Sequence, residues 1–432
     1  MPSLKILRYG DSSPQVEMLQ LALSRSGFSA GNTDGIFGKR TQNAVIDFQR
    51  ANRLMPDGIV GNETWNALSP YIKGYVIHRI RRGDTFYSVA SRYSSTVRAV
   101  MTANPRVDPL NLQIGSDLTV PLNFSVVPTN IRMTSPLMDF IADGITARYP
   151  FISRSSIGKS VMGKPLYAFR IGEGKTNVFY NGAHHANEWI TAALLLFYLE
   201  KYAESFVFGG MIGGENAREL FSSATLHMIP LVNPDGVDLV TGNLTVGRYY
   251  NDAVRMSRAY PDIPFPSGWK ANISGTDLNL QYPAGWENAR EIKFSQGFKS
   301  PAPRDYVGSS PLSAPESRAV YDYTRRNDFA LTMSYHSQGE VIYPRYLDYT
   351  PPCSLEIGRI LASLSGYTLS DTPYESGYAG YKDWFIYEYF RPGYTVEVGK
   401  GVSPLPLSQF DSIYRDNAPM LSAAQILTNT CG

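Results

Sequence analysis

Two histidines and a glutamate in this chain have the spacing of a metal site. His185 and Glu188 follow the apolar run TNVFYNG, where the sequence changes from a strand-like to a helical pattern. An H-x-x-E spacing lets an imidazole and a carboxylate reach one ion at roughly 2.0–2.2 Å. His336, at the end of the run FALTMSYH, supplies a third ligand from another strand. Two His and one Glu leave the fourth position of a tetrahedral zinc ion open for water, which is the catalytic arrangement.

A fourth candidate, Glu397, ends the apolar run YTVEV. A strand-end glutamate on its own is typical of a protein surface, and only the three ligand candidates favour a role in proton transfer. The chain has five histidines. Of the other three, we expect His78 to be structural, His184 to pack beside or orient its neighbour, and His227, within ATLHMIPL, to be a core histidine.

The elements that must position these residues are strands. Between residues 134 and 432 the strand-like runs TNVFYNG, ATLHMIPLVN, FALTMSYHS and YTVEVG alternate with helical stretches. Alternation on this scale predicts an α/β domain with a mixed central sheet. Ligands of such sheets collect at the carboxyl ends of the strands. The candidate residues stand at those ends.

The front of the chain contains an internal repeat. The segment DGIFGKRTQNAV, beginning at Asp34, returns 23 residues later as DGIVGNETWNAL, beginning at Asp57. Each copy reads as a tight turn followed by the start of a helix. A further amphipathic helix precedes them, so residues 2–73 are predicted to form a small three-helix domain. This segment resembles the peptidoglycan-binding type 1 domain.

Residues 75–121 read as strand, helix, helix, strand. The segments VIHRI and LTVP supply the strands, and Gly83-Asp84-Thr85 opens the first helix. With its GDTFYSVA, NP and IGSDLTVP segments, this βααβ unit resembles a LysM domain, a class that binds glycans containing N-acetylglucosamine. A Pro- and Asn-containing linker is expected at residues 122–133. An ordinary helical appendage without a ligand is the alternative for each module.

Residues 134–432 resemble the M14-type zinc carboxypeptidases. The segments GAHHANEWIT, VNPDG, GTDLN, SYHSQG and GYTVEVG match that family's motifs in order. The resemblance implies one zinc ion on the His-Glu-His set, with Glu397 as the general base that accepts a proton from water. It also implies that Lys270 takes the place of the arginine that stabilises the oxyanion, although an ammonium lacks the guanidinium fork. Tyr374 falls near the family's mobile tyrosine, with one gap.

The chain departs from the carboxypeptidase pattern at the substrate-binding motif. Asn279 is kept, but Leu280 replaces the arginine that clamps a terminal carboxylate, so strict selection of a free C-terminus loses its main electrostatic source. Lys382 stands just before Asp383, at a position that the resemblance places at the bottom of the pocket for the leaving residue, and a lysine there would favour a substrate with an extra carboxylate such as diaminopimelate. A true carboxypeptidase would need another cation, such as Arg255 or Arg258.

The whole chain resembles the γ-D-glutamyl-L-diamino acid endopeptidases of Gram-positive bacteria. That resemblance implies cleavage of the bond between D-glutamate and diaminopimelate or lysine in cell-wall stem peptides. The expected partners are the glycan strands and stem peptides of peptidoglycan. The alternatives are a zinc carboxypeptidase that trims wall peptides and a wall-binding protein without catalysis.

Composition sets limits on these readings. Net charge is +2 over 432 residues, and the first 121 residues hold 14 Lys and Arg against nine Asp and Glu. This suits an anionic wall polymer better than nucleic acid. The longest apolar run, Trp189–Leu199, is too short for membrane insertion.

Cys353 and Cys431 allow one disulfide at most. The start MPSLKILRYG has no apolar leader core, so we expect a wall or spore protein of cytoplasmic or mother-cell/forespore origin, or one whose leader was removed.

Overall fold

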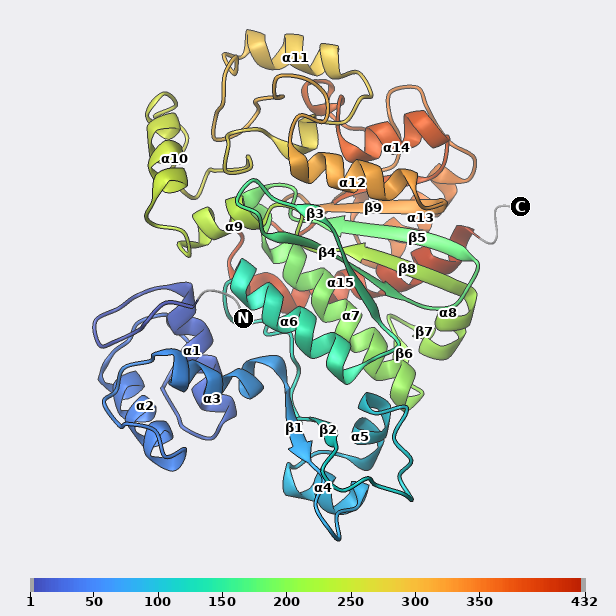
Figure 1. The fold of residues 1–432 in the computed structure, drawn as a ribbon. Helices are drawn as coiled ribbons and strands as arrows, with labels where there is room; N and C mark the ends of the chain where they lie inside the picture. The colour runs from blue at the N-terminus through green and yellow to red at the C-terminus, as the bar shows by residue number, and fades with distance from the viewer. Residues whose placement is uncertain (1–3, 429–432) are drawn as a thin grey trace. The chain divides into compact units, whose positions relative to one another are not determined.

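The computed structural model describes residues 4–428 (Figure 1). By packing, the chain divides into two units. The first holds the described residues up to Arg132 together with Pro136–Ser153. The second holds Met133–Ser135 and the residues from Arg154 onward. The pairing of Cys353 with Cys431 lies outside the described residues, because Cys431 is not among them.

Three helices open the first unit. They are α1 (Pro14–Arg25), α2 (Lys39–Ala51) and α3 (Asn62–Lys73). The two copies of the sequence repeat are the turns before α2 and α3. The Gln20 side chain from α1 donates to the carboxylate of Asp34 and to the carbonyl of Ile36, and it accepts from the amide of Gly35. Gln49 of α2 makes the same bonds to the second turn. The repeat therefore codes for a repeated hydrogen-bond network.

The βααβ part of the first unit has the predicted order. Its elements are β1 (Tyr75–Arg79), α4 (Phe86–Arg92), α5 (Val97–Ala103) and β2 (Asp117–Pro121), and β1 pairs antiparallel with β2. A capping box between Thr85 and Ser88 starts α4. His78 is buried, with Nε2 2.8 Å from Asp84 and Nδ1 3.1 Å from the Tyr93 hydroxyl. Both ring nitrogens thus serve the fold, as a structural histidine requires.

The helix α6 (Ser135–Arg148) lies, from Pro136, with the first unit by packing. The sequence predicts a boundary after residue 133, ahead of this helix. Gly144 lies against the main chain at the end of α3, and a Cβ there would overlap the carbonyl group of Lys73. Glycine at this position allows the close approach of the two helices.

The second unit is built on an eight-stranded mixed sheet, as predicted. The strand order is β11-β10-β12-β9-β5-β8-β4-β3. The bounds are β3 Ser153–Lys159, β4 Pro165–Ile171, β5 Thr176–Gly182, β8 Ala224–Ile229, β9 Phe329–His336, β10 Val341–Tyr343, β11 Thr368–Leu369 and β12 Gly393–Glu397. β12, β9, β5 and β8 run parallel at the centre, and β4 and β10 are antiparallel to their neighbours β8 and β12. Parallel central strands bring their carboxyl ends to one edge.

Helices cover both faces of this sheet (Figure 1). One layer consists of α7 (Ile190–Phe208), α8 (Ala217–Ser223) and α15 (Phe410–Leu427), and the other contains α12 (Pro315–Arg325) and α14 (Tyr381–Tyr389). The remaining elements are β6 Met211–Ile212, β7 Glu215–Asn216, α9 Pro234–Thr241, α10 Arg248–Arg258, α11 Trp286–Ser295, α13 Ser354–Ser365 and the short helices η1 Ala186–Glu188, η2 Leu278–Leu280, η3 Tyr374–Ser376 and η4 Leu407–Gln409. Among the helices of residues 4–428, none is long and apolar enough to cross a bilayer.

Candidate functional site

The candidate site lies where the central strands end. β12, β9 and β5 are neighbours and run parallel. His336 is the last residue of β9, and Glu397 is the last residue of β12. β5 ends at Gly182, and the chain then turns through His185 into η1, which carries Glu188. The topology thus brings together residues that are about 210 positions apart in the sequence.

The loop after β5 is fixed by buried hydrogen bonds. Ala183 adopts a positive φ of 51°, and its N–H donates to Thr191 Oγ1 at 2.9 Å. The fully buried Asn233 donates its side-chain amide to the carbonyls of His184 at 3.1 Å and Ala271 at 3.0 Å. Asn233 therefore ties the ligand loop to the segment that carries Lys270.

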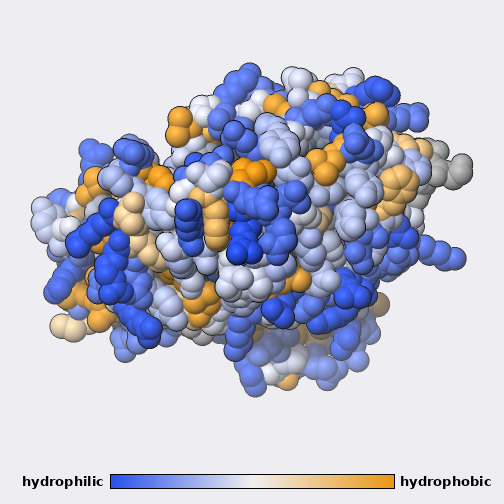
Figure 2. Space-filling model, turned by 90° about the horizontal axis from the view of Figure 1, so that it is seen from above, coloured by the Kyte–Doolittle hydropathy of each residue, from blue (hydrophilic) through white to orange (hydrophobic). Residues whose placement is uncertain are grey.

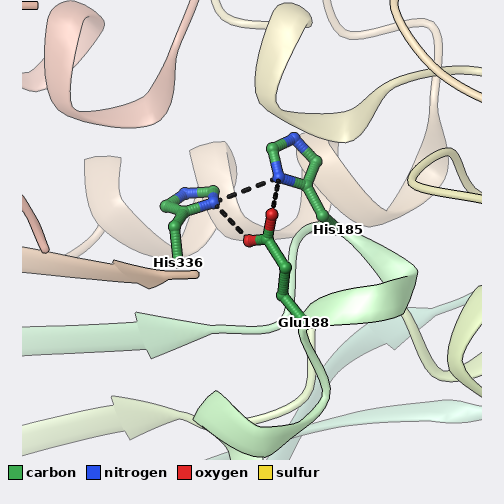
Figure 3. Close-up of side chains that lie close together, drawn as sticks. All are labelled: His185, Glu188 and His336. Carbon is green, nitrogen blue, oxygen red and sulfur yellow. Dashed lines mark hydrogen bonds and ion pairs between the residues drawn. The ribbon is translucent and has the colours of Figure 1, made fainter. Parts of the chain in front are cut away.

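Figure 3 shows the three ligand candidates pointing toward one another. Glu188 Oε1 lies 3.0 Å from His185 Nδ1, and Glu188 Oε2 lies 2.9 Å from His336 Nδ1. The two Nδ1 atoms are 3.2 Å apart. One donor atom from each residue fits within 4.8 Å of the others. Two imidazole nitrogens facing each other beside a carboxylate form a donor set that suits one Zn²⁺ ion.

The charges of this cluster are strongly coupled. Burial lowers the pKa of His185, but the carboxylates of Glu188 and Asp277 outweigh burial and raise that pKa to about 9. Burial alone would raise the pKa of Glu188, and the cations of His185 and Lys270 instead hold it well below its usual range. Burial lowers the pKa of His336. A buried anion among cationic and neutral donors is the electrostatic setting of a metal ligand.

Asp277 orients the first histidine from behind. Its Oδ1 lies 3.2 Å from His185 Nε2, the ring nitrogen that faces away from Glu188. Asp277 itself accepts from the backbone N–H groups of Asn279 and Asp305, each at 3.1 Å. Although burial opposes it, the His185 cation lowers the pKa of Asp277 well below its usual range. A carboxylate behind a ligating histidine fixes the ring orientation and the tautomer.

Glu397 and Lys270 lie on the open side of the cluster. Burial, followed by the Glu188 carboxylate, raises the pKa of Glu397 to about 8, although the Lys270 cation opposes the shift. Lys270 Nζ lies 2.9 Å from Glu188 Oε1, and 20% of the lysine side chain is exposed. Burial lowers the pKa of Lys270, but the Glu188 carboxylate more than offsets it and raises the pKa. A carboxyl group with a raised pKa and a lysine ammonium thus line the same space.

That space is a cleft of about 190 Å³. His185, His336, Lys270 and Glu397 line it, as do two substrate-binding candidates, Asn279 and Leu280. The Asn279 side-chain oxygen accepts from the backbone N–H of Tyr381 at 3.0 Å, which leaves its amide nitrogen without a partner in residues 4–428. Leu280 is buried in an apolar cluster with Trp286 and Ala379, so the residue at this position provides no cation.

Lys382 also lines the cleft, but its ammonium is engaged by the protein. Nζ donates to the carbonyl of Arg345 at 2.6 Å and to Thr372 Oγ1 at 3.2 Å, and it pairs with Asp383 Oδ1 at 2.6 Å. Only 3% of the side chain is exposed. The ammonium therefore has three protein partners: two hydrogen-bond acceptors and the Asp383 carboxylate, which balances its charge as an ion pair. A substrate carboxylate would have to displace one of them.

Three further residues from the sequence analysis lie elsewhere. Tyr374 begins η3, is 69% exposed, and packs edge-on against Tyr378 rather than lining the cleft. Arg255, on α10, forms an ion pair with Asp252, and neither Arg255 nor Arg258 lines the cleft. The structure therefore does not bring Tyr374 to the ligand cluster, and neither α10 arginine replaces the missing clamp.

The two other histidines of this unit are buried supports. His184 stacks on the ring of His336 and bonds through Nε2 to the Tyr282 hydroxyl at 2.9 Å. His227 is 1% exposed, with Nδ1 2.7 Å from the Tyr323 hydroxyl, and burial lowers its pKa to about 4. His184 packs behind a ligand, and His227 is a core histidine, as predicted.

Sequence reasoning did not single out Asp277, Asn233 or Arg304. Asp277 and Asn233 stand in the GTDLN and VNPDG segments, so the segments were found but not these roles. The partners of Asp277 and Asn233 lie 92 and 49 positions away, beyond any local spacing. Arg304, which lines the cleft, follows a Pro-rich segment with no recognisable pattern.

Comparison with known families gives three matches along the chain. A zinc carboxypeptidase family matches residues 138–420, a putative peptidoglycan binding domain matches residues 12–68, and the LysM domain matches residues 78–121. The first match covers well over half of the chain and includes every candidate residue of the site.

Two bacterial proteins and one solved structure are similar to this chain. The γ-D-glutamyl-L-diamino acid endopeptidase 1 of Lysinibacillus sphaericus is 40% identical over 273 residues, which are 62% of this chain and 66%, just under two thirds, of that protein. The uncharacterized protein YqgT of Bacillus subtilis (strain 168) is 39% identical over 63% of this chain and 72% of its own length. The solved structure of bovine thrombin-activatable fibrinolysis inhibitor, in complex with tick carboxypeptidase inhibitor, has a TM-score of 0.54 at 20% identity, covers 69% of this chain and 98% of that one, and shows the shared fold. The chain belongs to the M14 zinc carboxypeptidase family and carries peptidoglycan-binding and LysM domains ahead of its peptidase domain.

Proposed function

We propose that this protein is a zinc-dependent endopeptidase that hydrolyses the γ-D-glutamyl bond to a diamino acid, diaminopimelate or lysine, in peptidoglycan stem peptides. One observation carries the proposal: the cleft combines a complete His-Glu-His set and Glu397 with a leucine, Leu280, where a carboxypeptidase needs a cation. The relative from Lysinibacillus sphaericus bears the name of this activity. The peptidoglycan-binding and LysM domains support a location at the cell wall. An association with spores stays a prediction.

The residues of the cleft divide the chemistry among them. His185, Glu188 and His336 would hold the zinc ion, which would act as a Lewis acid on the scissile carbonyl and lower the pKa of a neighbouring water. Glu397 would accept the proton of the attacking water on its carboxylate and later deliver it to the leaving amine. Lys270 would stabilise the negative charge that develops on the carbonyl oxygen.

Substrate binding would use the walls of the cleft. The unpaired amide nitrogen of Asn279 would donate a hydrogen bond to a carbonyl or carboxylate oxygen of the substrate. Tyr374, exposed beside the cleft-lining Pro373, would have to move to touch the substrate. The wall-binding domains would hold glycan strands and so raise the effective concentration of stem peptides at the cleft.

A carboxypeptidase that trims wall peptides is the alternative, and Leu280 disfavours it. The two activities are separated by digesting defined stem peptides with the zinc-loaded full chain and identifying products by mass spectrometry. We expect cleavage at the D-glutamyl–diamino acid bond in peptides that continue beyond the diamino acid. Release of single C-terminal residues only would support the carboxypeptidase instead.

A further inference from the structure

Besides Lys270 and Lys382, a cluster of three charged residues lines the cleft, as Leu280 does. It consists of Lys293 on α11, Asp305 and Arg304, and all three residues line the cleft. Asp305 lies between the two cations, with Oδ1 2.8 Å from Lys293 Nζ and Oδ2 2.6 Å from Arg304 Nε. We call these three residues the 293–305 charge cluster.

The backbone next to Arg304 is tied to the catalytic candidates on both sides. The carbonyl of Pro303 accepts from the N–H groups of Lys270 at 2.8 Å and Ala271 at 2.9 Å. The N–H of Asp305 donates to Asp277 Oδ2 at 3.1 Å. Arg304 is therefore held between the segment of Lys270 and the carboxylate that orients His185. These main-chain hydrogen bonds fix the backbone at Arg304 relative to the segments that carry Lys270 and Asp277.

Among the described residues, Arg304 carries free donors at the cleft in addition to the Asn279 amide and the Lys270 ammonium. Lys293 is 7% exposed and paired with Asp305, while Lys382 is 3% exposed, has two hydrogen-bond acceptors and forms an ion pair with Asp383. Arg304 uses Nε for Asp305, and within residues 4–428 its two terminal nitrogens have no partner. Its side chain is 41% exposed. Two parallel N–H groups on one guanidinium bind a carboxylate end-on through both oxygens.

We infer that Arg304 binds a carboxylate of the residue on the leaving side of the scissile bond and so replaces the clamp absent at Leu280. This inference rests on the proposed function and names the determinant of its specificity. A diamino acid offers that carboxylate in two ways: a free α-carboxylate, when it ends the peptide, or the side-chain carboxylate of diaminopimelate. Under this inference Arg304, and not Lys382, selects diaminopimelate, because the Lys382 ammonium is already held by other groups of the protein.

The experiment uses four substrates that share the γ-D-glutamyl bond. The peptides end in lysine, in lysine-alanine, in diaminopimelate-alanine or in diaminopimelate, so the leaving residue carries an α-carboxylate only, neither carboxylate, a side-chain carboxylate only, or both. kcat and KM are measured for the full chain and for Arg304→Gln, Arg304→Lys and Lys382→Met. Arg326→Gln is the matched control, an exposed arginine that does not line the cleft.

We expect Arg304→Gln to raise KM about 10- to 100-fold on substrates with the recognised carboxylate, the usual worth of a charged hydrogen bond. KM for the lysine-alanine peptide should change less than twofold, Arg304→Lys should restore part of the loss, and Arg326→Gln should match the wild type. A loss confined to peptides that end at the diamino acid identifies the α-carboxylate, and a loss confined to diaminopimelate identifies the side chain.

An equal loss on all four peptides would mean that Arg304 only supports Asp305 and Asp277, and would overturn the inference. The same holds if Lys382→Met, and not Arg304→Gln, shows the carboxylate-dependent loss. Calorimetric binding of free diaminopimelate provides a readout independent of turnover. If the wild type cleaves none of the peptides, the proposed function fails, and equal binding of diaminopimelate to wild type and Arg304→Gln then decides against Arg304 as well.

Discussion

Glu397 and His336 are register partners on the adjacent parallel strands β12 and β9. Each is the last residue of its strand, so the proposed proton acceptor and a metal ligand candidate are positioned by one sheet edge rather than by separate loops. Main-chain pairing holds both residues to the regular spacing of neighbouring strands. His185 and Glu188 come from the loop after β5, the strand on the other side of β9.

Glu397→Gln should abolish most turnover while leaving metal binding intact. The amide keeps the size of the side chain but cannot accept a proton from water, and loss of a general base typically costs about 10²- to 10⁴-fold in rate. Zinc content and kcat on a diaminopimelate tripeptide are the measurements. Glu356→Gln, at an exposed position of α13, is the matched control. Near-normal turnover of Glu397→Gln would assign the proton transfer to another group.

His336→Ala should lose stoichiometric zinc, because it removes one of the three candidate ligands. Metal analysis after gel filtration measures this directly. His227→Gln, which alters a buried histidine outside the cleft, should keep its zinc. Full zinc content in His336→Ala would exclude His336 as a ligand.

Asp277→Asn should weaken the site without destroying it. The neutral amide no longer balances the positive charge of the His185 ring. Loss of such an outer carboxylate typically costs about 10- to 100-fold in metal affinity. Competition with a chelator of known affinity gives the value. Asp322→Asn, on α12 away from the cleft, provides the comparison. An unchanged zinc affinity would limit Asp277 to its backbone contacts.

The core histidine should make the second unit sensitive to acid. Burial lowers the pKa of His227 from 6.5 to about 4, so the unfolded chain takes up a proton before the folded chain does. The stabilisation is fully present above pH 6.5 and is lost as the pH falls toward 4. At pH 5 the loss amounts to roughly 2 kcal/mol in the free energy of unfolding.

His227→Gln should therefore flatten the decline in stability between pH 7 and pH 5 by about that amount. Denaturant unfolding followed by tryptophan fluorescence measures it, since Trp65 is the only one of the five tryptophans outside the second unit. Tyr323→Phe removes the hydroxyl partner but keeps the histidine buried, so it should retain the pH dependence. Parallel pH profiles for wild type and His227→Gln would contradict the assignment.

The first unit should bind the wall without the peptidase. A chain that ends at Ser153 contains the first unit, including α6, and we expect it to sediment with insoluble peptidoglycan sacculi. Oligomers of N-acetylglucosamine should reduce the bound fraction, because the LysM domain matches a glycan-binding class. A chain that stays in the supernatant at concentrations where the full protein sediments would place wall binding elsewhere.

The features predicted from the sequence are those that depend on short segments of the chain. The repeat beginning at Asp34 and Asp57 predicted the helical domain. The strand-end positions of His336 and Glu397 predicted that both residues lie at one edge of the sheet. The role of Asp277 was not predictable, because its contact with His185 depends on two distant loops meeting. The contacts that hold the Lys382 ammonium were missed for the same reason, since both of its hydrogen-bond acceptors come from other segments of the chain.

The duplicated turn network of the first unit links its three helices in series. Gln20 on α1 closes the turn before α2 and bonds Thr41 in the first turn of that helix. α2 carries Gln49, which does the same for Thr64 and α3. Each helix thus specifies where the next one starts. Loss of Gln20 and loss of Gln49 should therefore destabilise this domain by similar amounts, because each removes the same set of bonds to one turn and one helix start.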